Sequence, residues 1–145
     1  MVEHVAYDIT ELESQFTTLR RGEAQSSARN AAVLAFLIHA RNLLGFYWPP
    51  TPGRQRAGDV FAFDFMPGLI IHPPSTRESV PELKKAISTR VAHICLLRAE
   101  RLQWTANVIN GVVRDATAAF LVNLPEPFRS EFTKHKVMHE SWRLD

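Results

Sequence analysis

The chain contains a single cysteine, Cys95, among its 145 residues. One thiol cannot close an intramolecular disulfide, build a cysteine zinc cage or form a Cys-x-x-Cys redox pair. Glycine is also scarce, with 6 residues. None of them belongs to a Gly-x-Gly-x-x-Gly motif, a phosphate-binding Gly-Lys-Ser/Thr loop or the Gly-x-Ser-x-Gly of serine hydrolases. The sequence therefore predicts no cofactor and no serine hydrolase.

Long hydrophobic runs are missing as well. The longest, from Ala31 to Ile38, is much shorter than the roughly twenty residues of a membrane-spanning helix. The first residues, Met-Val-Glu-His-Val-Ala-Tyr-Asp, have neither the basic nor the apolar segment of a secretory signal. We therefore expect a cytoplasmic protein with no membrane partner.

The net charge of +2 is too small to identify a nucleic-acid partner, but the charges are unevenly distributed. Acidic residues gather in the first segment, whereas basic residues predominate later, at Lys84, Lys85, Arg90, Arg98, Arg101 and Arg114. A continuous basic face attracts phosphate. The same pattern also fits an ordinary solvated helix surface.

Apolar residues recur at helical spacing through most of the chain, which predicts an all-α fold. A first stripe consists of Val5, Ile9, Leu12, Phe16 and Leu19. A second helix should begin between Glu23 and Ala28 and end near Trp48, where prolines follow. A third should start at Ser79, with Pro81 in its first turn and Glu82 completing a capping box.

No proline or glycine follows Pro81 until Gly111, and an unbroken helix of that length is too long for a compact domain. We therefore place a break near Gln103 to Asn107, with Thr105 as a cap, and a fourth helix that ends before Pro125. Its core face consists of Val108, Ile109, Val112, Val113, Ala116 and Phe120. The predicted architecture is a single-domain four-helix bundle over residues 1–145, with a long, partly ordered connection over 49–78 and a short C-terminal helix or tail over 128–145.

Arginine interrupts two of these apolar stripes. On a helical wheel, Arg41 and Arg90 both lie among large aliphatic residues. A buried guanidinium cannot lose its charge, so it needs a carboxylate, carbonyl oxygens or a bound anion. The aromatic segment between the second and third helices contains Asp59 and Asp64. We expect it to fold over both helices and bring these carboxylates to the two arginines.

Histidine accompanies both arginines. His39 shares a helix face with Asn42, and His93 follows Arg90 within one turn. If the two helices pack together, these side chains converge on one pocket suited to acid–base chemistry on a phosphodiester. The catalytic candidates are His39, His93 and Arg90, and the binding candidates are Arg41, Asn42, Asp59, Asp64 and Arg90. A hydrogen-bonded network that fixes helix register explains the same residues without catalysis.

Two further histidines, His135 and His139, lie one helical turn apart near the C-terminus. Zinc sites use this spacing, but two histidines need at least a third ligand. Glu140 lies beside them, but we expect this segment to be exposed and therefore predict no metal site.

Three segments resemble a family of small uncharacterised prokaryotic helical proteins: Phe36-Leu-Ile-His-Ala-Arg-Asn-Leu-Leu-Gly-Phe-Tyr47, Asp59-Val-Phe-Ala-Phe-Asp64 and Ile87-Ser-Thr-Arg-Val-Ala-His-Ile94. More distantly, a helical bundle with embedded arginine and histidine resembles HEPN domains, whose active members are metal-independent RNases of toxin and defence systems. The resemblance implies RNA as a partner in a stress or defence system.

The HEPN signature is an arginine followed by four to six residues and then a histidine. Neither Arg41 nor Arg90 has that relation to His39 or His93, and the literal match runs from Arg129 to His135 near the C-terminus. This departure favours a non-catalytic bundle that acts through binding. The alternative is a non-enzymatic module that dimerises or docks on a partner protein, with anchors at Phe61, Phe63, Phe65, Trp104 and Trp142.

Overall fold

The computed structural model describes residues 1–21, 26–49, 58–73, 79–92 and 102–135. These residues form six α-helices and no strand, which confirms the predicted all-α class. The helices are α1 (Val2–Arg21), α2 (Ser26–Tyr47), α3 (Ala62–Phe65), α4 (Val80–Ala92), α5 (Leu102–Asn123) and α6 (Phe128–Lys134). No helix in this part of the chain is long and apolar enough to cross a membrane.

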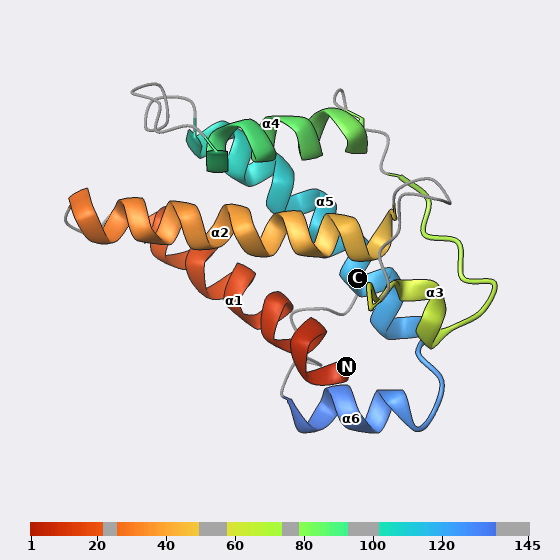
Figure 1. Cartoon of the computed structure of the whole chain (residues 1–145). Coiled ribbons are helices and arrows are strands. Elements are labelled where there is room, and N and C mark those ends of the chain that lie inside the picture. Colours follow the sequence, from red (N-terminus) through yellow and green to blue (C-terminus); the bar gives the residue numbers. More distant parts are fainter. Residues whose placement is uncertain (22–25, 50–57, 74–78, 93–101, 136–145) are drawn as a thin grey trace.

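The central element is α2. It lies between α1 and α4 and also contacts α5, while α6 contacts α1 (Figure 1). Its most deeply buried side chains are each at most 1% exposed and form one broad face, namely Phe36, Leu37, Ala40, Leu43 and Leu44. The other side of the helix carries Ile38 and Arg41, which are exposed.

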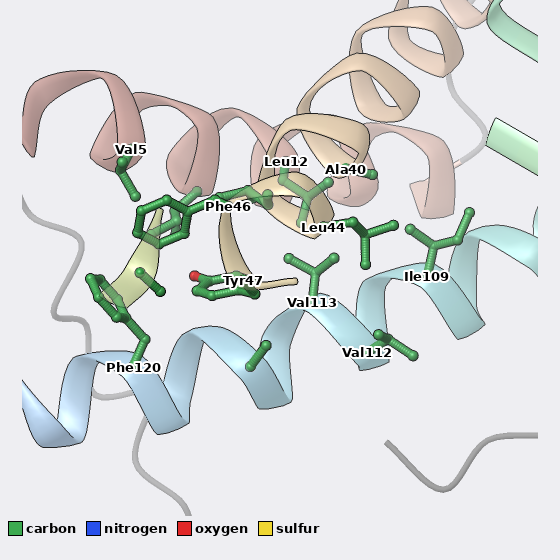
Figure 2. Close-up of a cluster of buried hydrophobic side chains, with 14 of the residues drawn as sticks. Val5, Leu12, Ala40, Leu44, Phe46, Tyr47, Ile109, Val112, Val113 and Phe120 are labelled. Carbon is green, nitrogen blue, oxygen red and sulfur yellow. The ribbon is translucent and has the colours of Figure 1, made fainter. Parts of the chain in front are cut away.

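An aromatic cluster joins α2 and α5 with the two short helices. The Phe120 ring is fully buried and lies edge-to-face against Phe46, Phe65 and Phe132, with ring centroids 5.2, 5.7 and 5.6 Å away. Figure 2 shows Phe46, Tyr47 and Phe120 gathered in the space between α2 and α5. These rings anchor α3 and α6 to the long helices.

One polar contact lies inside this core. The Tyr47 hydroxyl donates a hydrogen bond of 2.8 Å to the Thr117 hydroxyl, which donates in turn to the Val113 carbonyl at 2.7 Å. Burial raises the pKa of Tyr47 far above its ordinary value, so the phenol keeps its proton. Both hydroxyl groups therefore have partners, which removes most of the cost of burying them.

The predicted start of the third helix is confirmed at α4. The Glu82 carboxylate accepts hydrogen bonds from the Ser79 backbone N–H at 2.7 Å and from the Ser79 hydroxyl at 2.8 Å. The backbone bond is the larger cause of a lowered Glu82 pKa. These contacts form a capping box, because the Glu82 N–H also reaches the Ser79 hydroxyl oxygen at 3.5 Å.

The predicted break between the third and fourth helices is wrong in position. Helix α5 is continuous from Leu102 to Asn123, so Thr105 lies inside it rather than at its cap. No proline or glycine marks the boundary, and packing of the apolar face determines where the helix lies. That face is predicted correctly: Ile109, Val112, Val113, Ala116 and Phe120 are buried, and Val108 is half-buried.

The connection after α2 contains α3, and the C-terminal segment contains α6, so each predicted short element is a helix. Phe61 and Phe65 are 7% and 2% exposed. They belong to the core, and the prediction that they anchor a partner is wrong because α3 packs inward. Phe63 is 38% exposed and stacks on Phe61. The Trp104 side chain and Trp142 lie outside the described residues.

Glu13 of α1 faces α5 and provides a test of buried charge. Its Oε1 atom lies 3.7 Å from Arg114 Nε and accepts no hydrogen bond from a described residue. Burial raises the Glu13 pKa, and the Arg114 charge opposes this rise. The unfolded chain ionises near pH 4.5 and the folded chain at higher pH, so this group lowers stability as the pH rises through that window.

We therefore expect Glu13→Gln to be at least as stable as the wild type at neutral pH. The variant should also lose less stability than the wild type as the pH rises above 4.5. Chemical denaturation across this pH range measures both effects, with Glu11→Gln on the same helix as the control for net charge. A less stable Glu13→Gln protein would mean that the Arg114 ion pair outweighs the cost of burial.

Candidate functional site

A groove of about 630 Å³ opens between α1, the C-terminal half of α2 and the segment that leads into α3. Polar side chains line it from all three, namely His4, Asp8, Arg41, Asn42 and Asp59. Its apolar lining consists of Val5, Phe46, Val60 and Phe61. A concave surface with a few convergent polar groups is the usual form of a ligand site.

Asp8 of α1 connects the groove to α2. Its Oδ1 atom lies 2.6 Å from His39 Nδ1 and accepts a hydrogen bond of 3.3 Å from Asn42 Nδ2. An ionised carboxylate only accepts hydrogen bonds, so we infer that His39 Nδ1 carries a proton and donates it. His39 and Asn42 lie one turn apart on α2 and therefore reach the same carboxylate.

The His39 imidazole is 9% exposed and does not line the groove. The Tyr7 ring covers it edge-on, with ring centroids 5.5 Å apart. The predicted network of polar residues thus exists at His39 and Asn42, but it joins α2 to α1 rather than to the helix that contains Arg90. This arrangement makes His39 a residue that positions Asp8.

Arg41 is exposed, so the prediction of a buried guanidinium is wrong. On a helical wheel Arg41 lies among apolar residues, which predicts a covered face. The helices around α2 nevertheless leave Arg41 open to the groove. Among the described residues, none forms a hydrogen bond or an ion pair with the Arg41 guanidinium. An exposed cation at the edge of a groove is available to an anionic ligand.

Gly45 follows Arg41 by one turn and also lines the groove. A Cβ atom added at Gly45 would meet nothing within 4 Å. Packing therefore does not require glycine here, although glycine inside a helix costs roughly 0.5–1 kcal/mol relative to alanine. Its small size leaves the groove open beside Arg41.

The two aspartates of the aromatic segment have different positions. Asp59 lines the same groove as Arg41, so the segment does lie over α2 at this point. Asp64 does not line the groove, and its Oδ2 accepts a 2.7 Å hydrogen bond from the Phe61 backbone N–H. This carboxylate closes the first turn of α3. Its pairing with an arginine stays a prediction, because the Arg90 side chain lies outside the described part of the chain.

Three other candidates have different outcomes. The structure describes the backbone of Arg90 in α4 but not its side chain, and His93 lies outside the described residues. Their convergence with the groove stays a prediction. Arg129 of the literal HEPN match donates through Nε to the Leu124 carbonyl at 3.1 Å. This guanidinium caps the end of α5.

The residues of the predicted basic face lie in different environments. Arg98 and Arg101 lie outside the described residues. Lys84 is half-buried, donates to the Trp48 carbonyl and has a pKa lowered by burial. Arg114 lies beside Glu13, and Lys85 is exposed. Metal binding gains no support, since the described residues contain no group of three or more suitable ligands and His139 lies outside them.

Sequence patterns did not identify Asp8, His4 or Gly45 as site residues. Asp8 lies next to Ile9, at the edge of the first apolar stripe, and His39 lies at the edge of the apolar face of α2. A carboxylate and an imidazole at the edges of two apolar stripes predict a hydrogen-bonded pair only when it is known that the two helices pack together.

No protein-family model matches this chain, and no curated protein or solved structure matches it significantly. The chemistry of the groove is therefore the basis for a proposed function.

Proposed function

We propose that the chain is a non-catalytic, HEPN-like bundle of four main helices that binds single-stranded RNA in the cytoplasm, as part of a stress or defence system. Four helices are long, and α2 contacts α1, α4 and α5, which supports the bundle. The observation that carries the proposal is the Arg41 guanidinium, exposed in a groove and without a described partner.

The groove has the composition expected for binding a single nucleotide rather than a long stretch of phosphate backbone. A guanidinium binds phosphate through two parallel hydrogen bonds. The Asp8 carboxylate in the same groove repels further phosphates but accepts hydrogen bonds from N–H groups. Single-stranded RNA presents both features, a phosphate and an unpaired base edge.

The position of His39, one of the predicted catalytic histidines, does not support cleavage by this residue. His39 donates to Asp8 and does not line the groove, so it does not face a ligand held there. A general base must lie within hydrogen-bond reach of the proton that it removes. The His39 imidazole therefore orders the site by holding Asp8.

Replacement of Arg41 by glutamine should weaken binding of a short single-stranded RNA by roughly tenfold, because a hydrogen-bonded charge is lost. Fluorescence anisotropy at low salt measures the affinity. The slope of log affinity against log salt concentration should decrease by the contribution of about one phosphate contact. Arg29→Gln, at an exposed position near the start of the same helix, is the matched control.

A second variant tests the groove without changing charge. Gly45→Leu places a side chain in open space beside Arg41, so it should block binding while the helix stays folded. Far-UV circular dichroism and thermal unfolding check the fold. The proposal fails if no RNA binds at low salt, or if the Arg41 and Arg29 variants bind equally well.

A second candidate function is docking of a second copy or a partner protein. Tyr7 of α1 and Ile38 of α2 are 59% and 41% exposed, and Tyr7 packs on His39, the residue after Ile38. Exposed apolar side chains on two packed helices are suitable anchors. Sedimentation at high protein concentration tests self-association, and a strictly monomeric protein excludes the dimer.

A further inference from the structure

The Asp8 carboxylate is held in one orientation at the wall of the groove. Its Oδ1 atom takes hydrogen bonds from His39 and Asn42, at 2.6 and 3.3 Å. An ionised carboxylate has about four acceptor positions, two on each oxygen. No described residue donates to Oδ2, and the Asp8 side chain is 19% exposed. The acceptor positions that remain are thus on Oδ2.

This orientation exists before a ligand arrives. The His39 ring is nearly buried under Tyr7, so its Nδ1 atom cannot follow a rotating carboxylate. A free surface aspartate would lose rotational freedom on binding, whereas Asp8 has already lost it. A preorganised acceptor discriminates between ligands more strongly than a mobile one, because the fixed carboxylate cannot rotate away from a ligand group that donates no hydrogen bond.

We infer that Asp8 determines the ligand specificity of the groove, and that the groove selects nucleotides whose base has an exocyclic amino group, which are cytosine, adenine and guanine, over uracil. The inference rests on the proposed RNA binding and names its preferred bases. Arg41 supplies the contact to phosphate, Asp8 accepts from the amino group, and His39 is the positioning residue.

Cytosine and uracil are the sharpest comparison, because the two rings have the same size. Cytosine presents the N4 amino donor at the position where uracil has the O4 acceptor. A carboxylate oxygen accepts a hydrogen bond from the amino group. It cannot form one with the uracil carbonyl, because both oxygens are acceptors. A site that leaves a buried or fixed polar group unpaired loses affinity for that ligand.

The test compares fluorescently labelled oligocytidylate and oligouridylate of equal length by anisotropy at neutral pH. The wild type should bind the cytidine oligomer roughly tenfold more tightly, the effect of one hydrogen bond to a charged group. Asp8→Asn should reduce or reverse this preference, because its amide N–H donates to the uracil O4 atom. Asp115→Asn, an exposed aspartate on α5, makes the same charge change and should keep the preference.

Each outcome separates this inference from the proposed function. Equal affinity of the wild type for both oligomers, with binding still weakened in Arg41→Gln, overturns the base preference and leaves RNA binding intact. A preference that persists in folded Asp8→Asn overturns the role of Asp8. Failure of both oligomers to bind overturns RNA binding and the inference together. The wild-type comparison needs no variant, so it decides the preference even if Asp8→Asn does not fold.

Discussion

Replacement of Phe120 by alanine is expected to lower the free energy of unfolding by about 3–5 kcal/mol. The Phe120 side chain is fully buried in α5, and its ring contacts rings from α2, α3 and α6. Alanine removes the apolar surface that this ring buries and also leaves a cavity, because the four surrounding rings, of Phe46, Tyr47, Phe65 and Phe132, cannot all move into the space. The loss should therefore lie in the upper range for a single substitution.

Urea denaturation followed by circular dichroism measures this loss. The matched control is Phe63→Ala, because Phe63 lies in α3 but is 38% exposed. Its replacement should cost well under half as much, since less apolar surface is removed from a packed site. Equal losses for the two variants would show that the aromatic cluster does not hold α3 and α6 in place.

The second large effect is expected for His39→Ala, which should cost about 2–3 kcal/mol of stability. The substitution removes a nearly buried ring together with the donor that lies 2.6 Å from Asp8. It leaves a partly buried carboxylate with the longer Asn42 hydrogen bond as its described contact. It also removes the surface on which Tyr7 packs.

A double-mutant cycle with Asp8→Ala isolates the pair. The combined variant should be clearly less destabilised than the sum of the two single variants, because the second substitution removes a group that has already lost its partner. Additive losses would contradict the pairing of Asp8 with His39. A fully stable His39→Ala protein would mean that the imidazole does not hold α1 and α2 together.

Several elements were predictable because their signals act within a few residues. Ser79 and Glu82 mark the start of α4, since the capping box is a contact between neighbours in sequence. Pro125 follows the end of α5 closely, since proline cannot continue a helix. The break before α5 has no such marker, so it was misplaced.

The site was predictable only in part. Two parts of it agree with the structure: His39 and Asn42 share a face of α2 and both reach Asp8, and Asp59 lines the same groove as Arg41. These residues stand out in the sequence because a polar side chain in an apolar run needs an explanation. The helical wheel shows which residues share a face but not which neighbour covers that face. Arg41 was therefore expected to be buried, although it is exposed at the groove.

The amino-acid sequence by itself determined the all-α class, the capping of α4 and the apolar face of α5, because helical periodicity and capping depend on residues within one or two turns. Tertiary structure alone decided that Asp8 meets His39, a residue 31 positions further along the chain. It also decided that the strip containing Arg41 and Gly45 stays open. Such contacts depend on how α1 and the aromatic segment pack on α2, and that packing minimises the exposed apolar area of the whole chain rather than of any one segment.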